Sequence, residues 1–453
     1  MARIRQDIYT LASDSMEGRK AGYAGEHKAY TYITGRLHEA GIGPWQGSSY
    51  IEPFTQGYAA CIKPSHLSIP GKKFVWRYDF GVCSCSSNDS VFSVWANLGY
   101  GIPAPGRDSS ESLPDVNGKI AIINLDTPPE FRKTGTADAV LSPESRISNA
   151  IGKGACGIIM YNDPGGYRKR LFDFTRSDTF SVPVMYVLPE VVQAIIDHPG
   201  SKVNMSAHVS RAHRTFNNIV AYIDNKASRT IILGAHYDHL GKSLNSKDRG
   251  AFCVGADDNA SGTAGILELA RYYRHHRDSL NNYLVILFSA EEEGLLGSEY
   301  FVGQMRPSLK DSINFMMNFD MIGRLGCEGM QVTAEATGSS AAWNRLYKEI
   351  PHTGFRLKKI SPSLPFSDQD PFYLKGIPIL YLTTGLHGYY HTPKDRPATI
   401  NYTGMVSIIN YAEILVNTAG SGKKVTYRKV PALCMYIETA GFVFDFIGES
   451  LSF

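Results

Sequence analysis

Five short clusters of histidine and acidic residues stand out in the second half of this 453-residue chain. They combine imidazoles and carboxylates at spacings that suit divalent metal ions. Such donors bind zinc and other divalent ions, so the pattern predicts a metal site. In chain order the clusters are His236-Tyr-Asp238-His239, Gly255-Ala-Asp257-Asp258, Ser289-Ala-Glu291-Glu292-Glu293, Asp320, and Tyr390-His391-Thr-Pro-Lys-Asp395.

Each cluster occupies a position where a sheet of parallel strands presents its ligands. The pair Asp257-Asp258 opens a predicted helix at 261–276. Because ligands bind in open α/β sheets just beyond the carboxyl ends of the strands, we expect the side chains to meet at one edge. The other four clusters follow apolar runs that predict buried strands, at 230–235, 283–288, 315–319 and 377–382.

Taken singly, none of these residues requires a metal. An aspartate pair before a helix is an ordinary N-terminal cap, and adjacent glutamates often begin a solvated helix. The joint pattern, with each cluster at the correct end of an element, is what indicates a metal site. His239, His275 and His276 have no such placement, and we expect them to be structural or exposed.

Side-chain direction suggests how ligands could be shared. His236 and Asp238 lie two residues apart, so both can face one point, with His236 as a ligand and Asp238 accepting its other ring N–H. Asp257 can offer one oxygen to each of two metal ions. Asp320 and His391 complete the expected coordination sets.

The adjacent Glu291 and Glu292 suggest separate roles for two neighbouring carboxylates. One can bind metal while the other stays free beside a metal-bound water. Two divalent ions bring +4, which Asp257, Glu292, Asp320 and a bridging hydroxide balance. A single ion with the same ligands leaves −2, which is costly in a dry pocket.

The rest of the chain has an ordinary globular composition. Hydrophobic residues make up 43%, charged residues 20%, and the formal net charge is only +3. This balance gives no reason to expect nucleic acid or an anionic membrane as a partner. No apolar run approaches the roughly 18 residues of a membrane span.

Strands that alternate with helices after residue 215 predict an α/β fold, with a mixed, mostly parallel sheet flanked by helices. A β-rich insert at 49–211 separates the two segments of a discontinuous catalytic domain, residues 1–48 and 212–420. Within the insert, strands are expected at 119–125, 157–161 and 182–187. In the tail 421–453, a period-two series predicts a strand packed on the body: Phe442, Phe444 and Phe446.

Together these motifs resemble the dizinc aminopeptidase branch of the family-twenty-eight metallopeptidases, which has the zinc-exopeptidase fold. The segment Leu11–Arg19, with Gly22 and Gly25-Glu26 after it, is similar to the family's usual opening. The insert is similar to the protease-associated (PA) domain often found in these enzymes. The stretches that carry this likeness are Lys119–Asp126 and Gly154–Asp163.

The resemblance implies two Zn²⁺ ions that share Asp257 as a bridging ligand. His236 and Asp320 would complete one site, and Glu292 and His391 the other. A cis peptide bond is also implied, between Asp257 and Asp258.

The implied activity is that of an aminopeptidase, which removes N-terminal residues from peptides with a free N-terminus. A zinc-bound hydroxide would attack the scissile carbonyl, with Glu291 as the general base and Asp238 as the partner of His236. Some members carry a Tyr before a Ser-Asp-His motif. Here Ser363–Gln369 contains no Tyr and ends in Gln, which leaves Tyr389 or Tyr390 as candidate donors to the oxyanion.

Three alternatives within the family stay open. A glutaminyl cyclase would use one zinc, whereas both ligand sets are present here. A carboxypeptidase for acidic residues needs an arginine-lined pocket, and only Arg324 can be placed near the site. A non-catalytic binding protein would have lost ligands. The N-terminus has no apolar signal core. We expect an extracytoplasmic protein whose signal precedes this numbering, and a cytosolic protein is the alternative.

Overall fold

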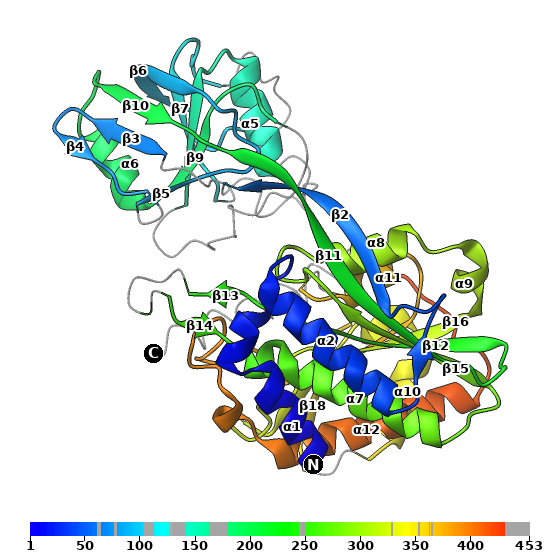
Figure 1. Cartoon of the computed structure of the whole chain (residues 1–453). Helices are drawn as coiled ribbons and strands as arrows, with labels where there is room; N and C mark the ends of the chain where they lie inside the picture. The colour runs from blue at the N-terminus through cyan, green and yellow to red at the C-terminus, as the bar shows by residue number, and fades with distance from the viewer. Residues whose placement is uncertain are drawn as a thin grey trace. The chain divides into compact units, whose positions relative to one another are not determined.

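The computed structural model describes residues 1–430 except 61–64, 77–78, 104–112, 127, 129–141, 163–178, 244–247, 249, 328, 352–353, 362 and 364–365. The chain divides into two compact units (Figure 1). Unit 1 comprises Met1–Thr55 and Thr215–Phe453, and unit 2 comprises Gln56–Arg214. The predicted domain borders, 48/49 and 211/212, lie within a few residues of these limits.

Unit 1 is built on a mixed sheet of nine strands. The order is β1-β11-β15-β12-β16-β19-β17-β18, and β2 also pairs with β11. The four strands β15, β12, β16 and β19 run parallel, which brings their carboxyl ends to one edge. The strands are β1 (Gly43–Pro44), β2 (Ile51–Ala60), β11 (Ser210–Ile223), β12 (Arg229–His236), β15 (Asn281–Phe288), β16 (Ile313–Phe319), β17 (Gln331–Glu335), β18 (Arg356–Lys359) and β19 (Ile379–Thr383).

Helices cover both faces of this sheet, because successive strand residues point to opposite sides. Leu233 and Leu287 belong to a buried cluster on one face, and Ile232 and Ile286 to a cluster on the other. Burying each such side chain contributes about 1.5–3 kcal/mol. The helices of the first cluster are α1 (Ala2–Leu11), α2 (Ala24–Glu39), α7 (Gly262–His275), α10 (Ala341–Glu349) and α12 (Tyr402–Ser421); those of the second are α8 (Leu296–Gly303), α9 (Pro307–Ser312) and α11 (Gln369–Leu374).

The α/β fold predicted from the sequence is confirmed, as are the strands expected to carry the site. The runs 230–235, 283–288 and 315–319 lie in β12, β15 and β16, and the run 377–382 corresponds to β19. The helix α12 and the pair β17–β18 are not in the prediction. In α12 buried residues occur around most of the circumference, and β18 reads Arg-Leu-Lys-Lys, so neither has a clear period.

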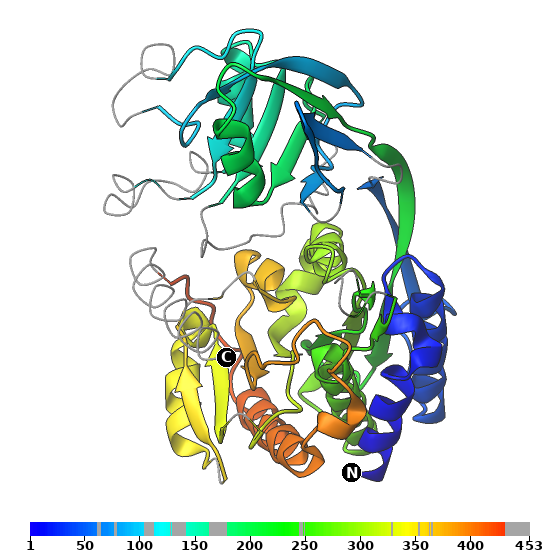
Figure 2. The ribbon, with the colours of Figure 1, turned by 90° about the vertical axis from the view of Figure 1, so that its left-hand side faces the viewer.

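Unit 2 contains an eight-stranded sheet of order β4-β3-β10-β6-β7-β8-β9-β5. Two helices pack on opposite faces of it: α5 (Pro143–Gly152) shares a buried cluster with Ile158, and α6 (Pro189–Ile196) shares one with Ile159 (Figure 2). The strands are β3 (His66–Ile69), β4 (Lys72–Lys73), β5 (Phe80–Val82), β6 (Ser90–Asn97), β7 (Ile120–Asn124), β8 (Gly157–Tyr161), β9 (Val184–Val187) and β10 (Lys202–Ser206). The three strands predicted within the insert correspond to β7, β8 and β9.

After α12 the described chain continues to residue 430 without a strand, although Val425 and Val430 are buried against unit 1. The predicted strand with Phe442, Phe444 and Phe446 lies outside the described residues. Among the described helices, none combines the length and the apolar character needed to cross a membrane.

Candidate metal centre

Acidic and imidazole side chains gather at the carboxyl edge of the unit 1 sheet. Since the central strands are parallel, the loops that follow them converge there. The side chains come from the end of β12 (His236) and the residues after it (Asp238, His239), the segment before α7 (Asp257, Asp258), the turn after β15 (Glu291, Glu292), the residue after β16 (Asp320) and the loop after β19 (His391).

One group of donors surrounds the ring of His236, which is almost fully buried. Its Nε2 lies 3.3 Å from Oδ1 of Asp320 and 3.4 Å from Oδ1 of Asp258. Oε2 of Glu291 is farther away, at 3.9 Å. His236, Asp320 and Glu291 each offer one donor atom to a single point, and Asp258 approaches the same imidazole nitrogen.

A second group contains His239, Asp258, Glu292 and His391. Nε2 of His391 lies 2.9 Å from Oδ2 of Asp258 and 3.1 Å from Oε1 of Glu292. Nδ1 of His239 lies 2.8 Å from the same Glu292 oxygen. Sequence reasoning sets His239 apart from the site, but the structure places it inside. Strand β12 ends at His236, so the alternation of side chains no longer decides where His239 points.

Asp258 is the residue common to both groups. Its Oδ1 faces His236 and its Oδ2 faces His391. The sequence prediction assigned this bridging position to Asp257, and the structure corrects it. The Asp257 carboxylate instead accepts hydrogen bonds at Oδ1 from the Gly323 amide (2.7 Å) and the Ser261 hydroxyl (3.0 Å). It therefore stabilises the loop that carries Asp258.

The cis peptide bond expected between Asp257 and Asp258 also lies one residue later. It joins Asp258 to Asn259. Both corrections have the same origin. The sequence prediction placed the carboxylate shared by the two groups, and the cis peptide bond, one residue too early in the run Asp257-Asp258-Asn259.

Asp238 supports the glutamates more directly than it supports His236. Its two oxygens accept hydrogen bonds from the backbone amides of Glu291 (3.1 Å) and Glu292 (3.3 Å). The nearest approach to Nδ1 of His236 is 3.7 Å, longer than a hydrogen bond. These hydrogen bonds hold the turn after β15, in which Ala290 has a φ of 57°. In this turn the Glu291 side chain points to the first group of donors and the Glu292 side chain to the second.

Arg19, from the N-terminal signature, stabilises the two loops that carry His236 and Asp258. Its fully buried guanidinium donates to the carbonyl of Tyr237 (2.7 Å) through Nε and to those of Leu11 and Val254 (2.7 and 2.5 Å) through Nη1. Nη2 donates to the carbonyl of Gly255 (2.9 Å). Burial lowers the pKa of Arg19 to about 10, and Asp258, Asp238, Asp395 and Glu292 oppose that shift. The residue therefore supplies a positive charge near the acidic cluster and ties its backbone together.

Two further features shape the segment before α7. The buried Asp395 accepts hydrogen bonds from the amides of Asp257 and Asp258. Gly255 has φ of 55°, and a Cβ there would lie 1.9 Å from the Asp258 carbonyl and 2.6 Å from the ring of His239. No larger residue fits, so the close approach of these two ligand segments requires glycine.

The surroundings of the two adjacent glutamates shift their pKa values in opposite directions. Burial raises the pKa of Glu291 well above its usual range, opposed by His236 and reinforced by Glu292. Burial also disfavours ionised Glu292, but His391 and His239 hold the pKa of that carboxyl well below its usual range. Glu292 therefore stays ionised while Glu291 takes up a proton readily, and such a divergence marks acid–base sites.

The spacing of the donors fits zinc. With bonds of about 2.0–2.1 Å, neighbouring donors around a tetrahedral zinc lie about 3.3 Å apart. Nε2 of His236 is 3.3 and 3.4 Å from its two carboxylate partners, and Nε2 of His391 is 2.9 and 3.1 Å from its own. Oδ2 of Asp258 is also buried without an aligned hydrogen bond from the described residues. A cation would satisfy it.

Tyr389 and Tyr390, the candidate donors to the oxyanion, differ in their surroundings. Tyr390 stacks on His391 with ring centroids 3.5 Å apart, whereas the ring of the half-exposed Tyr389 lies under the guanidinium of Arg324. Nη1 of Arg324 donates to the carbonyl of Thr399. One arginine engaged in this way gives no support for a pocket that recognises an acidic C-terminus.

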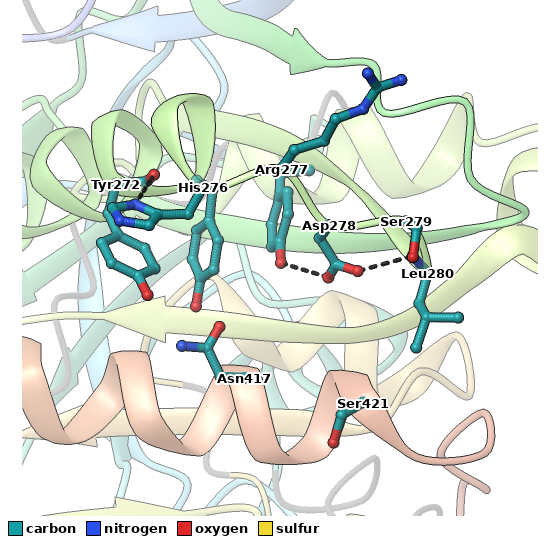
Figure 3. A pocket seen from close by; sticks show the side chains of 10 residues that line it. Tyr272, His276, Arg277, Asp278, Ser279, Leu280, Asn417 and Ser421 are labelled. Carbon is teal, nitrogen blue, oxygen red and sulfur yellow. Dashed lines mark hydrogen bonds between the residues drawn. The ribbon is translucent and has the colours of Figure 1, made fainter.

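A pocket of about 340 Å³ opens at the opposite end of the sheet (Figure 3). Its lining includes Tyr272, His276 and Asp278, and the Asp278 carboxylate accepts hydrogen bonds from Tyr283 and from the amide of Leu280. Because β15 begins here and ends at the metal centre, this pocket takes no part in the site.

Residues 218–415 match the model of Peptidase family M28. They form a family M28 peptidase domain. This M28 domain runs from β11 into α12 and contains every donor of the two groups described above. The match confirms the resemblance to the family-twenty-eight metallopeptidases.

Known relatives extend the likeness beyond the M28 domain. An aminopeptidase of Pseudomonas aeruginosa (strain UCBPP-PA14) is 26% identical over 404 residues, which cover 84% of this chain and 70% of that protein. Aminopeptidase YwaD of Bacillus subtilis (strain 168) is 26% identical over 313 residues, which cover 66% of this chain and 60% of that protein.

Two solved structures share the fold over nearly the whole chain, the insert included. An aminopeptidase from Aneurinibacillus sp. strain AM-1 superposes with a TM-score of 0.68 at 20% identity, covering 94% of this chain and 95% of that one. BSAP, a zinc aminopeptidase from Bacillus subtilis, gives a TM-score of 0.64 at 20% identity, with coverages of 95% and 98%.

Proposed function

We propose that this chain is an aminopeptidase whose two groups of donors would hold two zinc ions, with Asp258 as a ligand common to both groups. The observation that carries the proposal is the carboxylate of Asp258, whose two oxygens face separate imidazoles, His236 and His391. Asp320 and Glu292 then complete one ligand set each. The M28 domain and the relatives named aminopeptidase support the same conclusion.

In this proposal Glu291 is the general base. When bound, zinc polarises a substrate carbonyl and lowers the pKa of a coordinated water towards about 7. Glu291 takes the proton from the attacking water and returns it to the leaving amine, for which its raised pKa is suited. Asp238 holds the backbone of Glu291 and Glu292, and so keeps the base beside the first group of ligands.

Specificity for a free N-terminus would arise from acidic groups beyond the ligand set. Asp368 is fully buried, burial raises its pKa to about 7, and it interacts electrostatically with Asp320 and Glu291. A substrate ammonium brought beside Asp368 and Glu291 would compensate charges that the protein alone leaves buried at a cost. A blocked N-terminus lacks that charge.

Unit 2 is proposed to be a PA domain. Its β-rich sheet with one helix on each face, and its place in the sequence between the two segments of unit 1, support this interpretation. The structural neighbours that cover nearly the whole chain also extend through it.

The proposal is tested with chromogenic aminoacyl substrates, N-blocked analogues, and peptides that present an acidic C-terminus. Cleavage of the free aminoacyl substrates, lost with a chelator and restored by zinc, is the expected result. Cleavage of blocked peptides or release of C-terminal acidic residues would contradict it. Cyclisation of N-terminal glutamine with one zinc per chain would favour a glutaminyl cyclase, and no turnover in a zinc-loaded protein would favour a binding protein.

A further inference from the structure

The second group of donors contains two imidazoles, which distinguishes it from the first. His236 is the single imidazole of the first group, whereas His239 and His391 both belong to the second. On the proposed function, we infer that His239 is a fourth protein ligand to the zinc held by Asp258, Glu292 and His391. This zinc would then have a closed set of ligands, and the zinc at His236 would keep the open position.

Distances support a ligand role for His239. Its Nδ1 lies 2.8 Å from Oε1 of Glu292 and 3.6 Å from Oδ2 of Asp258. His391 lies 2.9 and 3.1 Å from the same two oxygens. All four values bracket the separation of about 3.3 Å between donors of a tetrahedral zinc. The two imidazoles thus approach the same pair of carboxylate oxygens.

Burial and packing orient the His239 ring towards this point. The side chain is fully buried, and neither ring nitrogen makes an aligned hydrogen bond with the described residues. Gly255 leaves the space that the ring fills, and the ring of His391 lies with its centroid 5.6 Å away. A buried imidazole that meets two carboxylate oxygens without aligned hydrogen bonds has the surroundings of a metal ligand.

The two zinc positions would consequently differ in function. Four protein donors close a tetrahedral site, whereas a site with three protein donors keeps a position for water or substrate. His236, Asp258 and Asp320 are three donors, and Glu291 lies beside them with Oε2 3.9 Å from Nε2 of His236. The proposed base therefore lies beside the group that has three closer protein donors.

Counting imidazoles per zinc tests this directly. X-ray absorption at the zinc edge of the two-zinc protein should give about 1.5 imidazoles per ion, which is three histidines over two ions, and His239→Ala should lower that value. A wild-type value of about 1.0, from His236 and His391 alone, would overturn the proposal. A chain that binds no zinc would instead refute the proposed function.

Variants separate a ligand from a residue that only positions Glu292 through a hydrogen bond. Retained zinc is measured by mass spectrometry after dialysis against a weak chelator. His239→Gln can still hydrogen-bond Glu292 but binds zinc poorly, so it should lose one of two zinc ions, as His239→Ala should, whereas His239→Cys should retain both. His275→Ala, at an exposed histidine of α7, is the matched control and should retain both. Full retention in His239→Gln would overturn the assignment.

Discussion

Asp257 and Asp258 are adjacent in the chain, yet their carboxylates have separate surroundings. Asp258 faces His236 with one oxygen and His391 with the other, at 3.4 and 2.9 Å. Asp257 turns away from both: its Oδ1 accepts from the Gly323 amide and its Oδ2 lies 3.2 Å from Nε2 of the buried His387. A loop-stabilising carboxylate and the proposed metal ligand thus occupy consecutive positions.

Asp258→Asn should therefore remove zinc far more effectively than Asp257→Asn. The first change takes a donor from both ligand sets, so we expect the retained zinc to fall to less than one ion per chain. The second leaves both sets complete and costs about 1–3 kcal/mol in unfolding free energy, because a neutral amide oxygen accepts the two loop hydrogen bonds more weakly than a carboxylate does. Metal content and urea unfolding of both variants provide the check, and a reversed order of zinc loss would restore Asp257 as the bridging residue.

This pair also illustrates how far the sequence determines the site. Strand periodicity and the ends of parallel strands were sufficient to predict His236, Glu292, Asp320 and His391 as neighbours. Periodicity cannot decide between two adjacent carboxylates in a segment of irregular backbone, where a single dihedral change redirects a side chain. His239 was not predicted as part of the site for the same reason. It lies beyond the last residue of β12, where strand periodicity no longer gives the direction of a side chain.

Glu291→Gln should separate catalysis from metal binding. Its carboxylate lies 3.9 Å from Nε2 of His236, outside the closer set formed with Asp258 and Asp320. We expect zinc content to be unchanged and turnover to fall by about 10²–10⁴-fold, the usual effect of losing a general base. Glu349→Gln, at an exposed position of α10, is the control and should leave both unchanged. Turnover at the wild-type level in Glu291→Gln would exclude the proposed base.

Arg19→Lys should destabilise the protein despite the retained charge. The guanidinium donates to four backbone carbonyls, which a single ammonium with three donors cannot all reach. Each buried carbonyl left unpaired costs about 1–3 kcal/mol, so we expect a loss of about 2–5 kcal/mol in unfolding free energy. Because Tyr237 adjoins His236 and Gly255 lies in the segment that carries Asp258, zinc affinity should fall as well.

The control for Arg19 is Arg345→Lys, at a side chain that is 71% exposed on α10. It should change stability by less than about 0.5 kcal/mol. Denaturant unfolding with and without zinc measures both effects. Equal stability of Arg19→Lys and the wild type would show that the N-terminal signature does not stabilise the metal loops.

Glu26→Gln should alter the dependence of stability on pH. The Glu26 carboxylate accepts hydrogen bonds from the Gly22 amide (2.8 Å), the Asn217 amide (3.2 Å), and the Tyr237 and Ser289 hydroxyls. Burial nevertheless raises its pKa above the usual 4.5, opposed mainly by the Ser289 hydrogen bond. The folded protein therefore retains this proton to a higher pH than the unfolded chain.

A raised carboxyl pKa gives stability that is complete below about 4.5, the pKa in the unfolded chain, and is lost as the pH rises through the folded value. The unfolding free energy of the wild type minus that of Glu26→Gln should thus decrease from about pH 4.5 upward and then level off. Urea unfolding of zinc-free samples across this range isolates the effect from metal binding. A difference for Glu26→Gln that increases with pH would mean that the hydrogen bonds from these four residues stabilise the ionised carboxylate by more than burial destabilises it.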